Sequence, residues 1–286
     1  MKKILACIDG SVISRDVCDA ACWVSEFVKA PIEVLHVLDK SEYQSSSNLS
    51  GNLAAGSREN LMEQLADLDE QRAKIAYQHG ALMLENALER IHSFGINEAE
   101  TTQMHGYFVD CVLDKMEETR VLVLGRQGMH HDKIQTPFSI GKHLTEILRA
   151  ATAPVLVTLQ EFREPKHAFL LAYDGSEQSA SNLNKIARSP LLKGLTCHLV
   201  MVGDASDDRK QQLSDAKAEL ESHGFNVVSD LLQGEVHYSL NQYLRRNNLE
   251  LLVMGAYGHS RIREFFVGSN TTRMISTSDV PILIMR

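Results

Sequence analysis

The chain repeats itself along its length, and this internal repeat limits its possible folds more than any other feature of the sequence. Each half opens with an apolar run that ends in Asp-Gly-Ser, and later segments of the two halves also correspond. The matching pairs are residues 4–11 with 169–176, 120–128 with 250–258, 153–157 with 280–284, and Gly106 with Gly234. A repeat that keeps this order over both halves indicates an internal duplication.

Each half alternates short apolar runs with segments of helical periodicity, which predicts an α/β fold. Residues 13–28, for example, carry apolar side chains at helical spacing between two strand-like runs. Five such runs in each half predict a doubly wound, five-stranded parallel sheet with helices on both faces. We therefore expect two tandem Rossmann-like domains over residues 1–160 and 166–286, joined by a short polar stretch that contains Pro165.

The two halves differ in one segment, between Asp39 and Gly95, which is much longer in the first half. It begins with a polar, turn-rich stretch at residues 45–57, which we interpret as a surface loop. The apolar residues after this loop recur at close to helical spacing and are Leu61, Leu65, Leu68, Ile75, Leu82, Leu88 and Ile91. This spacing predicts a long helix, weakened near Gly80. A plain insertion explains the segment better than a lid or a partner-docking element, although all of these fit.

The end of the second half has the composition of an anion-binding loop. A strand-like run at residues 251–254 leads into Gly255, Gly258 follows three residues later, and Gly268 precedes a predicted helix. Glycines let the backbone approach a ligand closely, and a helix N-terminus offers unpaired N–H groups and the positive end of a dipole. The short polar residues that open the helix are Ser269, Asn270 and Thr271. We interpret the segment as a cradle for nucleotide phosphates, while a glycine-rich connection that binds nothing fits the spacing equally well.

The composition argues against several classes of protein. The net charge of −8 and the isoelectric point near 5.8 disfavour a nucleic-acid-binding protein, which normally presents a basic face. No apolar run is long enough to span a bilayer, and the first residues lack the apolar core of a signal peptide, so we expect a cytoplasmic protein with no membrane partner. Five cysteines without framework spacing fit a reducing compartment. Cys18 and Cys22, one helical turn apart, are better explained as small apolar helix residues than as a redox or metal pair.

Two halves that each open with strand-Asp-Gly-Ser, of which the second closes with Gly255-x2-Gly258-x9-Gly268-Ser269, resemble the universal stress protein family. The resemblance covers nearly the whole chain, and the glycine motif is similar to that of the family's ATP-binding branch. It implies a tandem member with a fold like that of adenine nucleotide alpha-hydrolases. It also implies a role in stress response or signalling and a bound adenine nucleotide, ATP first, with magnesium as a further candidate.

The resemblance assigns roles to individual residues of the second half. Asp174 would lie beside the adenine and ribose, backbone groups near Val202 would fix the adenine edge, and the glycines would line the ribose and phosphates. The predicted nucleotide-binding residues are Ala172, Tyr173, Asp174, Val202, Met254, Gly255, Gly258, Gly268, Ser269, Asn270 and Thr271. A ligand at the carboxyl ends of parallel strands also agrees with the physics of this fold.

The first half departs from this pattern. Its candidate motif begins with Gly125 and Gly128, but the next glycine is Gly141, so the loop is longer than in the second half. Lys142 stands where the family has Ser or Thr, and Pro137 stiffens the loop. Because the hydroxyl is missing and the spacing differs, we predict that the first half is empty or holds a ligand other than ATP.

The sequence lacks the motifs of common hydrolases. It has no Gly-x4-Gly-Lys-Ser/Thr loop, no Gly-x-Ser-x-Gly elbow and no His-Glu-x2-His. We therefore expect a binding module in which ATP orders residues 259–267 and changes how Phe265 and Phe266 meet an unidentified protein partner. Two alternatives stay open. One is a weak ATPase, with His259 as the nearest ionisable side chain, and the other is an interaction protein whose nucleotide is structural.

A run of ionisable residues at His130, His131 and Asp132 suggests a metal hypothesis. Adjacent side chains diverge on an extended strand, but a loop could bring both histidines to one ion, with His143 completing the site. A polar loop explains this run better, and we expect no metal here.

The last strand-like run of each half, at residues 155–159 and 282–286, would leave an exposed apolar edge. In the family that the chain resembles, the corresponding strands pair between domains. The resemblance therefore implies that the two halves pack on each other as an internal pseudo-dimer with a rough two-fold axis. A homodimer of whole chains is compatible with this arrangement.

Overall fold

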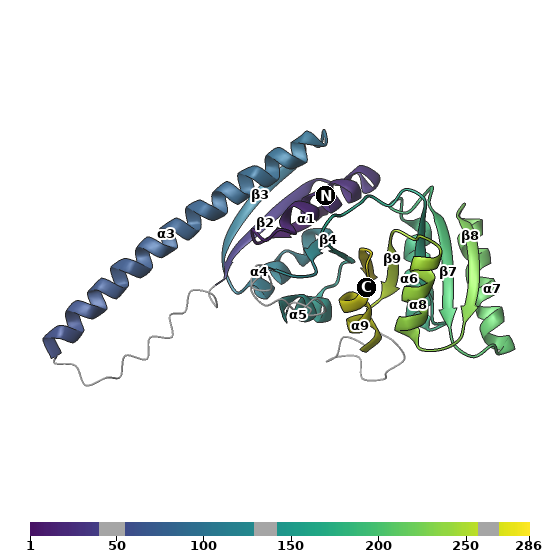
Figure 1. Ribbon diagram of the computed structural model, residues 1–286. Helices are drawn as coiled ribbons and strands as arrows, with labels where there is room; N and C mark the ends of the chain where they lie inside the picture. The colour runs from purple at the N-terminus through teal and green to yellow at the C-terminus, as the bar shows by residue number, and fades with distance from the viewer. Residues whose placement is uncertain (40–54, 129–141, 257–268) are drawn as a thin grey trace.

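A single sheet forms the centre of the molecule. The computed structural model describes residues 1–39, 55–128, 142–256 and 269–286. Its strands are β1 (Lys3–Ile8), β2 (Ile32–Asp39), β3 (Ala99–Gly106), β4 (Thr119–Gly125), β5 (Val155–Thr158), β6 (Ala168–Ala172), β7 (Thr196–Val202), β8 (Asn226–Leu232), β9 (Leu252–Gly255) and β10 (Ile282–Met285). They hydrogen-bond in the order β3-β2-β1-β4-β5-β10-β9-β6-β7-β8 (Figure 1).

Helices cover both faces of this sheet. They are α1 (Ser14–Val28), α3 (Ala55–Ser93), α4 (Phe108–Asp114), α5 (Lys142–Ala150), α6 (Glu177–Arg188), α7 (Asp207–Ser222), α8 (Val236–Arg246) and α9 (Ser269–Thr277), with the short 3-10 helix η1 (Met116–Glu118). Within the described ranges, none of the helices is long and apolar enough to cross a membrane.

Two hydrophobic cores lie on opposite faces of the sheet. Side chains alternate along a strand, so Ile4 and Ala6 of β1 belong to one core, whereas Leu5 and Cys7 belong to the other. The first core also contains residues of α1, α6, α7 and the end of α3, and the second contains residues of α4, α5, α8 and α9. Strands that are buried on both faces are typical of parallel sheets, and the predicted doubly wound α/β fold is confirmed.

The two halves share the sheet through one antiparallel contact. Within each half, all neighbouring strands run parallel. β5 and β10 run antiparallel between the halves, with Leu156 opposite Leu283. The strands that were expected to pair between the halves therefore do so, and each covers the edge that the other would leave open.

The two cysteines of α1 are free thiols that lie in one of the cores. Cys18 and Cys22 are both buried among apolar side chains. Burial raises the pKa of each thiol to about 12, so both stay protonated at neutral pH. Their interpretation as small apolar helix residues agrees with this environment.

The predicted long helix exists, and it continues through Gly80 without interruption. α3 runs without a break from Ala55 to Ser93, and Gly80 is buried where the helix passes over β2 and β3. A Cβ atom at this position would lie 2.6 Å from Cδ2 of His36 and 2.2 Å from Nε2 of Gln103. The glycine therefore permits a close approach between helix and sheet. The N-terminal part of α3 projects away from the sheet (Figure 1).

We predict that a Gly80→Ala variant is less stable than the wild type, although alanine favours a helix by about 1 kcal/mol over glycine. The added methyl group must displace the buried imidazole of His36, whose Nδ1 lies 3.1 Å from the carbonyl oxygen of Ile8. We expect the free energy of unfolding, measured by urea denaturation, to fall by about 1–3 kcal/mol.

A double-mutant cycle with His36→Ala provides the control. Once the imidazole is removed, Gly80→Ala should lose much of its cost, because only the end of the flexible Gln103 side chain still has to move. A stabilising effect of Gly80→Ala in the wild-type background would contradict the close-approach explanation.

Candidate functional site

The carboxyl ends of three strands in the second half form the candidate site. Ala172, Val202 and Gly255 are the last residues of β6, β7 and β9, which are neighbours in the sheet. α6, which follows β6, packs on one face of the sheet, whereas α9, which follows β9, packs on the other. In open α/β sheets, ligands bind in the crevice that opens where the connections leave toward opposite faces.

The Asp-Gly-Ser motif after β6 forms a tight turn that begins α6. Oδ1 of Asp174 accepts hydrogen bonds from the backbone N–H of Ser176 at 3.0 Å and from its hydroxyl at 2.6 Å. Gly175 has φ +77°, a left-handed conformation that suits glycine. The hydroxyl oxygen of Ser176 in turn accepts from the N–H of Ser179 and caps the helix. This turn fixes the Asp174 carboxylate at the strand end.

The same turn occurs in the first half. Oδ1 of Asp9 accepts hydrogen bonds from the backbone N–H of Ser11 at 3.0 Å and from the hydroxyl of Ser14 at 3.3 Å, and Gly10 has φ +80°. The repeated motif therefore has a structural role in both halves. A difference in ligand binding between the halves must come from the residues around the turn.

An arginine that the sequence did not single out lies at the end of β7. Nη1 of Arg209 donates to the carbonyl oxygen of Val202 at 3.3 Å, and its Nε lies 2.8 Å from Oδ1 of Asp204. A Cβ atom on Gly203 would lie only 1.8 Å from Nη1 of Arg209. Because Gly203 has no side chain, the guanidinium group of Arg209 can lie beside the position predicted for the adenine edge.

Gln212, one turn further along α7, reaches the Asp-Gly-Ser turn. Its Oε1 would lie 2.3 Å from a Cβ atom on Gly175. The first turns of α7 thus bring Arg209 and Gln212 over the ends of β7 and β6. Sequence reasoning missed both residues because α7 carries no motif, and the only local signal is the glycine that follows each strand.

Two of the predicted site residues, Tyr173 and Met254, contribute side chains to the cores. Tyr173 belongs to the core on the α6 face, and Met254 belongs to the core on the α8 face. The backbone N–H of Tyr173 donates to the carbonyl oxygen of Val200 at 2.9 Å and continues the sheet. The side chains of Tyr173 and Met254 therefore stabilise the strand ends by packing in the cores.

Thr271 attaches the first turn of α9 to the end of β9. It is 2% exposed, and its hydroxyl donates to the carbonyl oxygen of Ala256 at 3.0 Å, with the carbonyl oxygen of Gly255 at 3.5 Å. The start of α9 is thereby held beside the carboxyl end of β9. Asn270, next to it in this turn, is half-buried.

Several predicted residues cannot be compared with the structure. Those outside the described residues are Gly258, His259, Phe265, Phe266 and Gly268 in the second half, and His130, His131, Asp132, Pro137 and Gly141 in the first. Ser269 is described as the first residue of α9, and Lys142 as the first residue of α5. Across the described part of the chain, no three His, Cys, Asp or Glu side chains form a group that could hold a metal ion.

In the first half, side chains approach both glycines of the candidate motif. A Cβ atom on Gly125 would lie 2.3 Å from Cγ2 of the buried Ile13, and one on Gly128 would lie 2.6 Å from Oδ2 of Asp9. Counted from the Asp-Gly-Ser motifs, the position of Ile13 corresponds to Gln178 in the second half. The first half therefore packs an apolar side chain against its strand end, whereas Gln178 is exposed and its Nε2 donates to Oδ1 of Asn182 in α6.

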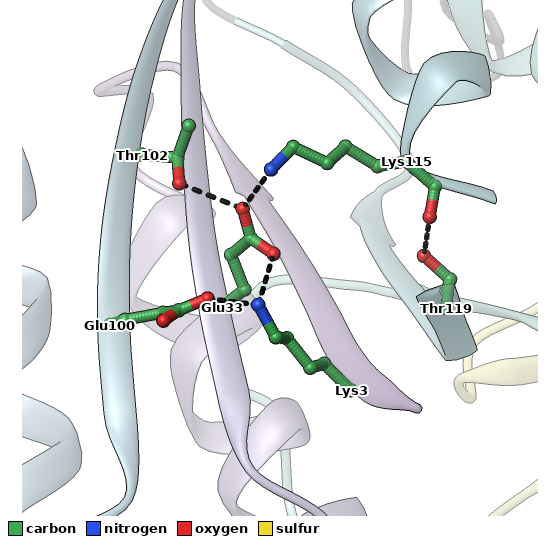
Figure 2. A network of polar contacts seen from close by, with 6 residues as sticks. All are labelled: Lys3, Glu33, Glu100, Thr102, Lys115 and Thr119. Carbon is green, nitrogen blue, oxygen red and sulfur yellow. Dashed lines mark hydrogen bonds and ion pairs between the residues drawn. The ribbon is translucent and has the colours of Figure 1, made fainter. Parts of the chain in front are cut away.

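A separate polar cluster lies near the amino end of β2 (Figure 2). Glu33 is 2% exposed, and its Oε1 accepts hydrogen bonds from Nζ of Lys115 and Oγ1 of Thr102, both at 2.7 Å. Lys3 lies between Glu33 and Glu100 and pairs with both. Burial would raise the pKa of Glu33, but these donors and cations outweigh it and hold the pKa below its usual range.

The second half has a polar cluster at the same place with other residues. By strand register, His198 occupies the position of Glu33, since each pairs with the matching leucine of the neighbouring strand. The hydroxyl of Tyr243 lies 3.0 Å from Nδ1 of His198 and donates to Oδ2 of Asp230. Because the residue types differ completely and both clusters lie away from the carboxyl ends of the strands, we interpret them as structural.

The fold and site define a duplicated, doubly wound α/β protein with its candidate ligand site in the second half. The sequence profile of the universal stress protein family matches residues 1–158 and 167–286. The chain is 33% identical over 290 residues to the universal stress protein Slr1230 of Synechocystis sp., covering 100% of both chains. It therefore belongs to the universal stress protein family.

Solved structures share the whole fold. A universal stress protein from Archaeoglobus fulgidus DSM 4304 superposes with a TM-score of 0.72 at 18% identity, covering 99% of this chain and 98% of that one. A functionally unknown protein, PA1789 from Pseudomonas aeruginosa PAO1, gives a TM-score of 0.62 at 12% identity, covering 100% and 92% of the two chains. The two-domain arrangement thus also occurs in proteins whose sequences have diverged widely from this one.

We predict that Glu33→Gln lowers the free energy of unfolding at pH 7 by about 1–3 kcal/mol, because charge-assisted hydrogen bonds are lost. The pKa of Glu33 is lower in the folded state than in the unfolded state, where it is about 4.3. Its stabilisation is therefore complete above that value and is lost as the pH falls through the folded-state pKa. Urea denaturation at several pH values should show the two proteins converging as the pH falls below the unfolded-state pKa of about 4.3.

Glu100→Gln is the matched control, because Glu100 also pairs with Lys3 but its side chain is 53% exposed. Its effect should stay below about 1 kcal/mol at every pH. Equal effects of the two substitutions would show that burial of Glu33 adds nothing to the strength of the cluster.

Proposed function

We propose that the second half binds an adenine nucleotide, ATP in the first place, and that the protein acts as a nucleotide-dependent switch in a stress response. The observation that carries this proposal is the convergence of the Asp174 turn and the start of α9 on the carboxyl ends of β6 and β9. Unpaired N–H groups at a helix start suit phosphates. Membership of the family supports the proposal.

In this proposal, the nucleotide lies along the strand ends. Asp174 contacts the ribose, and backbone groups at Val202 contact the adenine edge. The residues proposed to bind the nucleotide are Ala172, Tyr173, Asp174, Val202, Met254, Gly255, Gly258, Gly268, Ser269, Asn270 and Thr271. Arg209 and Gln212 extend this set, since both approach the same strand ends.

Thr271 has a positioning role in this arrangement. Its hydroxyl is already bonded to the carbonyl oxygen of Ala256, so its backbone N–H, near the start of α9, is the group available to a phosphate. Magnesium fits the donor set, because this ion is usually held by one or two carboxylates together with phosphate oxygens. Asp174 is the carboxylate at the strand ends that could hold it.

Binding, rather than catalysis, is the function that we propose. Nucleotide occupancy would order residues 259–267 and alter the surface that a protein partner meets. A weak ATPase and an interaction protein with a structural nucleotide are the alternatives, and a homodimer in the cytoplasm is the assembly that we propose. The first half, with Ile13 against Gly125, is proposed to bind no ATP.

The duplicated turn supplies a matched pair of variants. Asp174→Ala should weaken ATP binding at least about tenfold, because a charge-assisted contact to the ligand is lost. Asp9→Ala removes the equivalent carboxylate from the first half and should leave ATP affinity unchanged. Isothermal titration of nucleotide-free protein measures both affinities, and thermal unfolding without ATP shows that both variants are folded.

The proposal fails if nucleotide-free wild-type protein binds no ATP at millimolar concentration. Equal losses in the two variants would mean that the first half also binds ATP. Release of phosphate by the wild type at a substantial rate, abolished by Asp174→Ala, would favour the ATPase alternative over the switch.

A further inference from the structure

α3 carries an apolar stripe that is exposed in the described part of the chain. Leu68, Ile75 and Leu82 follow one another at intervals of seven residues, and their exposed fractions are 41%, 65% and 58%. Leu65, three residues before Leu68, is half-buried on the same side of the helix. Apolar residues that repeat every seven positions with a three-four spacing are the sequence pattern of a coiled coil.

A second apolar stripe of α3 makes the contacts with the sheet. Gly80, Leu84, Ala87 and Ile91 are buried and recur at intervals of three or four residues. Leu82 lies two residues from both Gly80 and Leu84, and therefore points to the opposite side of the helix. The stripe of Leu65, Leu68, Ile75 and Leu82, which we call the outer stripe, is thus separate from the docking face of α3.

Leu65, Leu68 and Ile75 of the outer stripe lie N-terminal to Tyr77, whose ring stacks on His105 of β3, and this part of α3 stands away from the sheet (Figure 1). From Met62 to Tyr77, the helix extends for about 22 Å at 1.5 Å per residue. A single helix of this length is only marginally stable in water unless it packs against something. Residues 40–54, which precede the helix in the sequence, are a poor candidate for that role, because they are mainly polar and rich in serine.

The charges of this segment are divided in a way that suits a second copy of the same helix. Residues 63–70 contain Glu63, Asp67, Asp69 and Glu70 and no basic residue, whereas residues 72–79 contain Arg72, Lys74 and His79 and no acidic residue. Two copies that run antiparallel place the acidic part of each beside the basic part of the other. A parallel pair would instead place like charges side by side.

We propose that α3 is an assembly element that pairs with α3 of a second copy of this chain as an antiparallel coiled coil centred near Glu70. In this register Leu65 of one copy lies opposite Ile75 of the other, and Leu68 lies opposite the aliphatic stem of Arg72. Arg72, whose Nη1 is 3.6 Å from Oδ1 of Asp69 in the same helix, would also approach Asp69 of the second copy. This assembly does not depend on nucleotide binding.

The oligomeric state of the full chain tests the proposal. Sedimentation analysis should find a dimer, with or without ATP. Ile75→Asp should weaken dimerisation at least about 50-fold, because an unpaired carboxylate enters the seam. Ala73→Asp is the matched control, since Ala73 is exposed on the same part of the helix but faces away from the outer stripe, and it should change the dimer little.

Single cysteine substitutions test the antiparallel direction. The native cysteines Cys7, Cys18, Cys22, Cys111 and Cys197 are all buried, so they give a low background of crosslinking. Asp69→Cys, close to the centre of the pair, should form an intermolecular disulfide on mild oxidation. Leu82→Cys should not, because in the antiparallel register the two copies of this residue are about 36 Å apart.

Several outcomes would overturn the proposal. A wild-type monomer at about 100 μM would show that the outer stripe is covered by something else, such as residues 40–54 or a different protein. A dimer that Ile75→Asp leaves intact would place the interface elsewhere on the chain. Efficient crosslinking of Leu82→Cys would exclude the antiparallel register. Loss of ATP binding with an intact dimer would refute the proposed function and leave this assembly standing.

Discussion

The antiparallel contact between β5 and β10 is the constraint on which the rest of the structure depends. Each strand would otherwise be an exposed apolar edge, and the contact converts two five-stranded sheets into one ten-stranded sheet. Both cores continue across this contact from one half into the other. Nη1 of Arg126 also donates to the carbonyl oxygen of Ser278 at 2.9 Å, and Nε of Arg286 donates to that of Ala151 at 2.7 Å. Backbone-directed bonds of this kind fix the relative orientation of the halves.

The features that could be predicted from the sequence are those with a local signal. Apolar runs of strand length and the Asp-Gly-Ser motif identified the strands and the duplication, because burial on both faces and a left-handed glycine each leave a pattern in adjacent residues. The contacts of Gly80 with His36 and of Gly203 with Arg209 left no such pattern. They depend on how closely two elements approach in the folded chain, which residue spacing alone does not encode.

The two structural polar clusters share a position in the duplicated fold but differ in their residue types. One position combines Glu33 with Thr102 and Lys115, and its counterpart combines His198 with Asp230 and Tyr243. In each half, a strand places one polar side chain inside an apolar layer, and the neighbouring elements supply its partners. The physical requirement is that the buried polar group is satisfied, and the residue types that satisfy it are interchangeable.

The continuous sheet also bears on how the two halves could diverge. In an assembly of separate, identical chains, any substitution enters every copy at once. Here the connection through residues 159–167 keeps the halves permanently tethered, so the effective concentration of each for the other is set by the linker and not by expression level. Ile13 could therefore fill the strand end of the first half without any change in the second half. In a fused chain the two halves can differ in ligand binding, because a half that stops binding a ligand still completes the sheet of the other half.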